Sequence, residues 1–242
     1  MSLPLQQHIE KDGFRLRGLE MSRIDGFSDV VFGFALTLLV VSLEVPKTFA
    51  ALHETMRGFL PFAICFYFLI AVWYSHYKFF RRFGTHDLGT IAINATLLFV
   101  VLFYVYPLKF LFTFIVDVFT GAPSTHIDSY WQIKELMALY GVGFAAIYFL
   151  IAALYWNGLR QRLQLGLNRH EEALARFYAI DSAGVASFGI VSCLVALALP
   201  GRFAGLAGWI YALTGVFKQL YSRGAMKRLQ QRRAALEHPS GN

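Results

Sequence analysis

The chain has 242 residues, of which 57% are hydrophobic and only 15% are charged, and its mean hydropathy is +0.50. Soluble domains carry about 25% charged residues, so this composition excludes a disordered chain and argues against an ordinary soluble domain. The net charge of +7 does not indicate a nucleic-acid partner, because the basic residues lie between apolar segments, where they act as membrane topology signals.

The chain begins with a polar and basic stretch, residues 1–26, which we expect to be a cytoplasmic N-terminal segment and not a cleaved signal. Beyond it the sequence predicts an all-α membrane protein with six helices long enough to cross about 30 Å of hydrocarbon. The predicted spans are residues 27–45, 59–77, 89–119, 135–156, 177–199 and 202–220. We therefore expect a six-span domain at 27–223 and a basic cytoplasmic tail at 224–242.

The third predicted span is too long for one straight crossing. Pro107 lies in its second half and predicts a kink, because proline cannot donate to the helical ladder. Lys109 follows and should reach for the outer interface.

The distribution of the 22 Lys and Arg residues sets the expected orientation. Most of them lie in the N-terminal segment, the second and fourth connections and the tail after the last span. Because basic residues stay on the cytoplasmic side, this alternation predicts that both termini are cytoplasmic. The expected location is the plasma membrane, crossed several times.

The sequence lacks the usual signals of catalysis and cofactor binding. The run His170-Glu171-Glu172 has no second histidine at zinc-protease spacing, so we interpret it as a solvated loop. Only His76 lies within or at the edge of a span, which leaves a bis-histidine haem without ligands. A phosphate-binding glycine loop, a nucleophile elbow and the TVGYG filter of ordinary potassium channels are all missing from the sequence. We expect no enzyme activity, no cofactor and no resident metal.

The first span begins with a charged residue inside an apolar run, Asp29. Ser28 or Asp29 could cap the helix, but a carboxylate at this depth also needs a partner. Arg23 is six positions away and is not a neighbour on the same helical face. His76, at the end of the second span, is the best candidate, although it could also be a simple interfacial histidine beside aromatic residues.

Three groups of residues resemble the signature of a known family. They are Arg23-x-x-x-Phe27-Ser28-Asp29 with Val31-Phe32 and Thr37-Leu38-Leu39-Val40, then Trp73 and His76 with Phe79, Phe80 and Arg81, and then Asn94, Leu97-Leu98-Phe99 and Pro107. This pattern resembles the transmembrane protein 175 family, the lysosomal and endosomal potassium channels and their bacterial relatives. The likeness covers about the first half of the chain. A single six-span unit resembles the bacterial branch, in which four copies surround a pore.

The resemblance implies a potassium-preferring cation channel, with a pore lined by the first span and an apolar constriction in place of a carbonyl filter. The implied partners are the bilayer, three further copies in a homotetramer and transiently bound potassium. The implied constriction residues are Phe34, Thr37, Leu38 and Val41, and the implied polar network at the cytoplasmic mouth is Arg23, Ser28, Asp29 and His76. Phe34 departs from the family, which usually has Ile or Leu there.

Other interpretations of these residues stay open. Phe34, Leu38 and Val41 could serve helix packing or lipid contact, and Thr37 could bond the carbonyl of Gly33 on its own helix. A secondary transporter is an alternative function, although the sequence lacks a midplane acid in most spans. A non-conducting membrane scaffold is another alternative, which the bulky Phe34 makes conceivable.

Overall fold

The computed structural model describes residues 8–41, 46–121, 127–211, 213–215, 217 and 221. Within these residues the regular secondary structure is helical, apart from one isolated β-bridge between Ile9 and Arg15. The helices are α1 (Arg23–Val41), α2 (Phe49–Arg57), α3 (Phe59–Phe83), α4 (Leu88–Thr120), α5 (Tyr130–Arg160), α6 (Arg169–Ala198) and the 3-10 helix η1 (Gly201–Trp209). The all-α class predicted from the sequence is confirmed.

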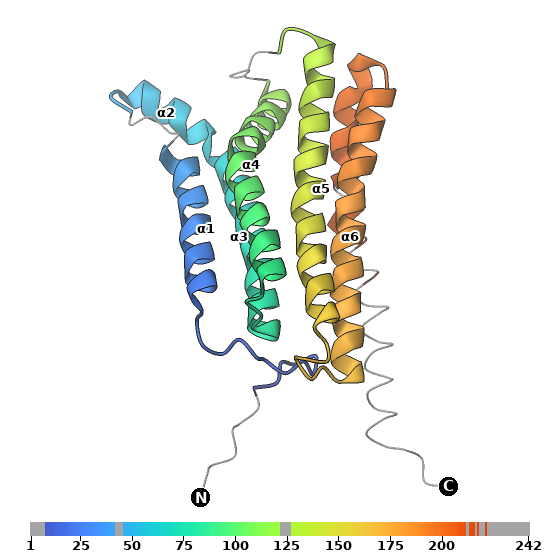
Figure 1. The fold of residues 1–242 in the computed structure, drawn as a ribbon. Helices are drawn as coiled ribbons and strands as arrows, with labels where there is room; N and C mark the ends of the chain where they lie inside the picture. Colours follow the sequence, from blue (N-terminus) through green and yellow to red (C-terminus); the bar gives the residue numbers. More distant parts are fainter. Residues whose placement is uncertain are drawn as a thin grey trace, which may run out of the picture.

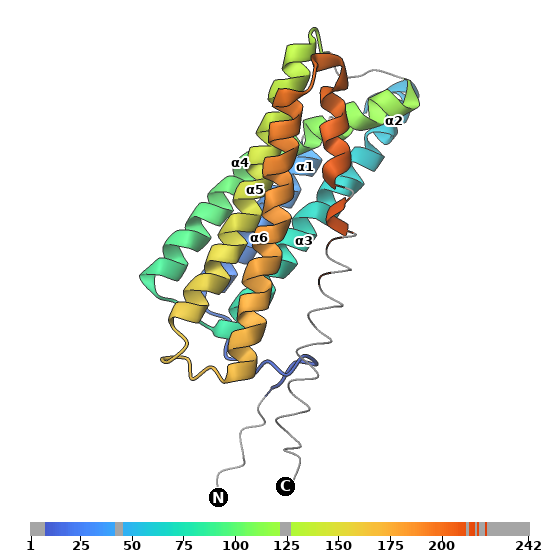
Figure 2. The same cartoon turned by 90° about the vertical axis from the view of Figure 1, so that its right-hand side faces the viewer.

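Five long helices, α1 and α3 to α6, stand side by side and run alternately up and down (Figures 1 and 2). Each of the five is long and apolar enough to cross a membrane. The predicted sixth span at 202–220 starts as η1 and continues through helical residues up to 215, but part of its range lies outside the described residues. The count of six crossings, like the tail at 224–242, stays a prediction.

The short helix α2 lies between the first two spans, at the opposite end of the bundle from the start of α1 (Figure 1). Its N-terminus is capped by Thr48, whose hydroxyl accepts from the amide of Ala51 at 3.1 Å. The sequence predicts only a connection between the spans at 27–45 and 59–77, and α2 lies in it.

Helix α4 continues through Pro107, and its second half turns away from the line of the first half (Figure 2). The amide of Leu111, one turn beyond the proline, donates to the Tyr140 hydroxyl at 2.7 Å. The Tyr104 hydroxyl in turn donates to the Tyr140 carbonyl at 3.0 Å. A proline together with a side chain bonded into the ladder is a known cause of helix bending. Tyr140 of α5 thus holds the bend that the sequence predicts.

Glycines allow α5 and α6 to approach closely. A Cβ atom on Gly141 would lie 2.5 Å from the carbonyl oxygen of Gly189, and one on Gly189 would lie 2.6 Å from that of Gly141. Small residues at such crossings permit backbone contact between membrane helices. Helix α1, in contrast, packs only against α3 and α4 among the described elements. The bundle therefore has α1 at one edge and the α5–α6 pair at the other (Figure 1).

Candidate functional site

One face of α1 is exposed along the whole helix. Phe27, Val30, Phe34, Thr37 and Val41 follow one another at steps of three or four residues, so they form a single stripe. Phe34 is 62% exposed and Val41 is 77% exposed. The stripe is apolar except for Thr37, and it gives α1 a continuous exposed surface within the described part of the chain.

The opposite face of α1 is buried against α3 and α4. Val31, Phe32, Ala35 and Leu39 lie there, and Ala35 and Leu39 are fully buried. Leu38 is partly buried and lies at the border between the two faces, in contact with the hydrophobic core. Of the four residues predicted to form a constriction, the structure therefore places Phe34, Thr37 and Val41 on the exposed stripe and Leu38 at its edge.

The hydroxyl of Thr37 donates to the carbonyl oxygen of Phe34 at 2.8 Å, three residues back and not at Gly33. Because the hydroxyl uses its proton in this bond, its oxygen can only accept a further hydrogen bond. Thr37 thus presents an oxygen acceptor in an otherwise apolar surface.

A buried chain of hydrogen bonds holds α1 to α3 and α4. The side-chain amide of Asn94 donates to the Ser28 hydroxyl at 2.9 Å, and the Asn94 carbonyl oxygen bonds Nε2 of His76 at 2.8 Å. The Ser28 hydroxyl itself donates to the carbonyl oxygen of Ile24 at 2.8 Å. Ser28, His76 and Asn94 are all at most 3% exposed. Since the Asn94 carbonyl oxygen is an acceptor, Nε2 of His76 carries a hydrogen.

Asp29 has a different partner from the one expected. Its Oδ1 accepts from the indole N–H of Trp73 at 2.8 Å, while His76 bonds Asn94. The expected direct pair of Asp29 and His76 is therefore wrong, although both side chains border the same cavity of about 160 Å³. Trp73 stacks on Tyr77 with ring centroids 5.5 Å apart, which fixes the indole for its bond to the carboxylate.

The start of α1 lies four residues earlier than predicted, and neither Ser28 nor Asp29 caps it. The Ser22 hydroxyl accepts from the amide of Asp25 at 3.2 Å, and the Asp25 carboxylate accepts from the amide of Ser22 at 3.1 Å. This reciprocal pair is a capping box. Arg23 is exposed and makes no hydrogen bond or ion pair with the described residues. The structure thus separates Arg23 from the other three residues of the predicted network.

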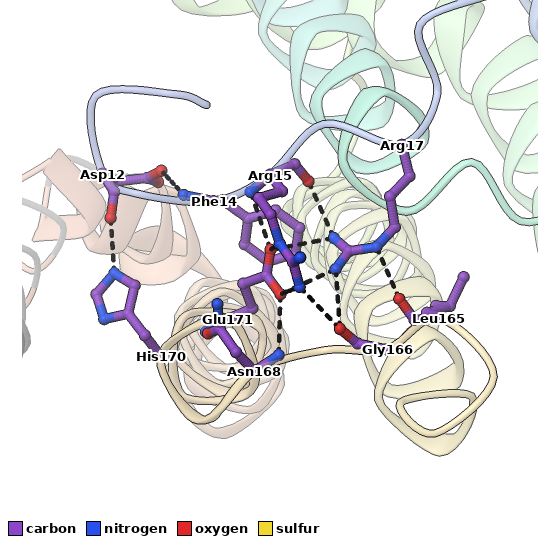
Figure 3. Close-up of polar contacts among 9 residues, drawn as sticks. All are labelled: Asp12, Phe14, Arg15, Arg17, Leu165, Gly166, Asn168, His170 and Glu171. Atoms are coloured by element: carbon purple, nitrogen blue, oxygen red, sulfur yellow. Dashed lines mark hydrogen bonds and ion pairs between the residues drawn. The ribbon is translucent and has the colours of Figure 1, made fainter. Parts of the chain in front are cut away.

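Residues 8–22, the described part of the N-terminal segment, lie across the end of the bundle and lead directly into α1 (Figure 1). Arg15 and Arg17 both bind the carboxylate of Glu171, with Nε of Arg15 at 3.1 Å from Oε1 and Nη2 of Arg17 at 2.9 Å from Oε2 (Figure 3). Glu171 also closes a capping box with Asn168 at the start of α6. The solvated-loop interpretation of Glu171 is wrong, because its side chain is fully buried.

A second ionic cluster fastens the same segment to α3. The guanidinium of Arg82 binds the carboxylates of Glu10 and Asp12, and it lies over the rings of Phe14 and Tyr178. Arg82 and Phe14 are fully buried. Burial opposes ionisation of Asp12, but the nearby Arg82 outweighs it and holds the pKa of this carboxyl below its ordinary value. The segment that precedes α1 is thus anchored on both α3 and α6.

The functional residues that sequence reasoning missed are Trp73 and Asn94 as bonding partners, and Glu171 and Arg82 as anchors. Trp73 and Asn94 were recognised only as parts of a pattern, since neither residue type by itself signals a buried bond. Among the described residues no group of three or more His, Cys, Asp or Glu side chains could hold a metal ion. The arrangement offers an apolar helix face fixed by a polar anchor, the hydrogen-bonded residues Ser28, Asp29, Trp73, His76 and Asn94.

Comparison with known proteins identifies the family of this chain. The model of the family described as "Endosomal/lysosomal potassium channel TMEM175" matches residues 23–104, which include α1 and its polar anchor. The chain is 37% identical over 232 residues to a potassium channel of Marivirga tractuosa, covering 90% of this chain and 94% of the relative. It is also 29% identical over 105 residues to a potassium channel of Chamaesiphon minutus, covering 40% and 52% of the two chains.

Solved structures agree with the sequence relatives. A crystal structure of a single-residue variant of the potassium channel MtTMEM175 superposes with a TM-score of 0.79 at 35% identity, covering 89% of this chain and 100% of the other. A TMEM175 homologue from Chamaesiphon minutus shares the fold, with a TM-score of 0.56 at 21% identity over 82% and 96% of the two chains. Family model, relatives and fold agree, and we conclude that this chain is a membrane protein of the TMEM175 family, whose matched members are ion channels and not enzymes.

Proposed function

We propose that the chain is a potassium-preferring cation channel whose pore is lined by α1, with Phe34, Thr37, Leu38 and Val41 at the constriction. The relatives described above are potassium channels, which supports ion conduction as the activity. The observation that carries the proposal is the exposed stripe of α1, which runs the length of a membrane helix and has no partner within the described chain. In a homotetramer, four such stripes around one axis would enclose a narrow path.

An apolar constriction selects ions by its radius and by the cost of removing water. Potassium gives up its hydration shell more easily than sodium, so a ring of Phe34 and Val41 side chains favours potassium. The hydroxyl oxygen of Thr37, which can accept, offsets part of the dehydration cost between the ring of Phe34 and the ring of Val41. Potassium binds here only in transit, and the activity needs no cofactor.

The polar anchor gives this constriction its fixed position. Ser28, Asp29 and His76 contact α3 and α4 through Trp73 and Asn94, so they set the rotation of α1 about its own axis. Because successive side chains are 100° apart, a rotation of α1 by that angle would replace Phe34 by its neighbour on the path, and a smaller rotation would turn its ring aside. Arg23, at the exposed start of α1, lies at the mouth.

We further propose six crossings with both termini in the cytoplasm and the protein in the plasma membrane. The described basic residues support this orientation, because most of them lie at the end of the bundle that holds residues 8–22 and the α5–α6 loop. Residues 1–26 would then be a cytoplasmic segment, 27–223 the channel domain and 224–242 a cytoplasmic tail. The remaining described lysines, Lys47, Lys109 and Lys134, lie on or toward the other side.

Purified protein in liposomes tests the proposal directly. Imposed potassium gradients should drive faster flux than equal sodium gradients, and Phe34→Ala and Leu38→Ala should each change the rate or the preference severalfold. Leu194→Ala is the matched control, since Leu194 is 60% exposed on α6, a helix that does not contact α1. Unchanged flux in both α1 variants would remove this helix from the ion path.

The same assay separates the alternatives. Flux that saturates at a low rate and requires a second, coupled ion would indicate a secondary transporter. Flux that is absent under every gradient would indicate a non-conducting scaffold. The oligomeric mass in detergent, measured alongside, should be four times that of one chain.

A further inference from the structure

A groove of about 470 Å³ lies between α5 and α6, with Ile93 of α4 at its side. Its walls are mostly apolar, and alanines such as Ala153 and Ala183 leave space that larger side chains would fill. Helix α1 contacts neither α5 nor α6, and the two helices form the opposite edge of the bundle (Figures 1 and 2). The groove is thus separate from the proposed ion path, and it lies along membrane-spanning helices where acyl chains are the surrounding solvent.

One end of the groove is basic. On α5, Ala153, Trp156 and Arg160 follow at steps of three and four residues, so Arg160 continues the groove wall toward the α5–α6 loop. On α6, Arg176 lies one turn before Ile180 on the same helical face. Tyr155 and Tyr178 stack at 5.5 Å, which shows that these stretches of the two antiparallel helices are level with each other.

The positive charge at this end is only partly neutralised by acidic side chains. Arg160 is exposed and makes no hydrogen bond or ion pair with the described residues. Arg176 pairs with Glu172 alone among the described residues, at 3.8 Å, and its side chain stays 59% exposed. Glu172 also lies 4.0 Å from Arg162, so one carboxylate is shared by two arginines. Asp87, which accepts from the groove residue Asn157 at 3.3 Å, is a second acid at this end. The three arginines therefore outweigh the two carboxylates, and the basic end keeps a net positive charge for an anion.

We propose that this groove is a binding site for an anionic phospholipid. An acyl chain lies along the alanine-lined wall, Trp156 marks the interface between hydrocarbon and headgroups, and the phosphate pairs with Arg160 and Arg176. Trp156 is 56% exposed, as expected for an aromatic residue at the headgroup level. Basic pockets between membrane helices are known to recognise anionic headgroups, with each basic residue adding to the affinity.

The test uses the whole protein in nanodiscs that contain equal amounts of phosphatidylglycerol and phosphatidylcholine. Native mass spectrometry of the released protein should show retained phosphatidylglycerol in clear excess over phosphatidylcholine. The double variant Arg160→Gln with Arg176→Gln should weaken this retention roughly 30-fold. The matched control, Lys11→Gln with Arg169→Gln, removes the same charge from exposed residues at the same end of the bundle but outside the groove, and should retain the lipid like the parent.

A second variant tests the apolar part of the site. Ala153→Phe fills the groove and keeps both arginines, so it should also lose phosphatidylglycerol while the oligomeric mass is unchanged. Equal retention of the two lipids, or equal loss in the double variant and its control, would overturn the proposal. Loss of oligomeric mass in Ala153→Phe would show that a second copy of the chain occupies the groove. Displacement of the retained lipid by inorganic phosphate alone would show a simple anion site without an acyl chain.

Discussion

The indole N–H of Trp73 donates to Oδ1 of Asp29 at 2.8 Å and joins two helices whose contacting residues are 44 positions apart. Asp29 is thus held by a neutral donor from α3 and not by a basic side chain. A carboxylate at the edge of an apolar helix is stable only with such a donor, because an unsatisfied charge at this depth is costly. The bond explains why an acid can sit at the base of the proposed pore helix without lying on the ion path.

Replacing Trp73 should therefore harm folding and assembly. We expect Trp73→Phe to lower the free energy of unfolding by about 1–3 kcal/mol, because the Asp29 carboxylate loses its donor. Thermal unfolding in detergent, read together with oligomeric mass, measures the loss. Tyr74→Phe, on an exposed ring of the same helix, is the control and should unfold like the parent.

The carboxylate itself can be tested separately. Asp29→Asn should reduce the yield of assembled protein while the ratio of potassium to sodium flux stays unchanged, since Asp29 serves as an anchor. Flux in liposomes and size-exclusion chromatography check the two parts. Normal assembly with an altered ion preference would place Asp29 on the conduction path and contradict its role as an anchor.

Asn94 is the central residue of the buried hydrogen-bond chain. Asn94→Leu leaves Nε2 of His76 without its acceptor and the Ser28 oxygen without its donor, so we expect a loss of about 2 kcal/mol in unfolding free energy. Thr96→Val is the matched control on the same helix, because Thr96 is exposed and bonds only the Ala92 carbonyl. Denaturation in detergent compares the two variants, and similar stabilities would show that the buried chain contributes little.

Two adjacent acids on α6 should behave differently. Glu171 is fully buried between Arg15 and Arg17, whereas Glu172 is partly exposed and makes only long ion pairs. Glu171→Gln should lower the free energy of local unfolding of residues 8–22 by about 3–5 kcal/mol, because it leaves two arginines without their anion. Glu172→Gln should lower the same free energy by well under about 1 kcal/mol. Hydrogen exchange of residues 8–22 should rise in the first variant alone. Equal protection in both would mean that the ion pairs do not hold the segment.

Asp87 should make the thermal stability of the protein depend on pH in the acidic range. Burial opposes its ionisation, but hydrogen bonds from Thr90, Gln161 and Asn157 outweigh this and lower the pKa of Asp87 to about 2, from an ordinary 3.8. A carboxyl with a lowered pKa contributes stability that is complete above its unfolded value and is lost as the pH falls toward the folded one. The thermal midpoint should thus decline between about pH 4 and pH 2, and the decline should be smaller in Asp87→Asn.

The sequence by itself determined the membrane class and the five long spans that the structure describes. Hydropathy and length are sufficient for this, because the bilayer imposes the same requirement on every crossing helix. The kink at Pro107 was also predictable, since the missing amide is a property of the residue itself. The residues around Asp29 also indicate the family from the sequence alone.

Only the tertiary structure decided which side chains meet. Trp73 and Asn94 bond Asp29 and His76 across three helices, and the rotation of each helix about its axis decides those contacts. Glu171 appeared solvated because its arginine partners lie about 155 residues earlier in the chain. Local sequence encodes which residues enter the membrane, but the pairing of polar groups depends on packing between distant segments, which hydropathy does not register.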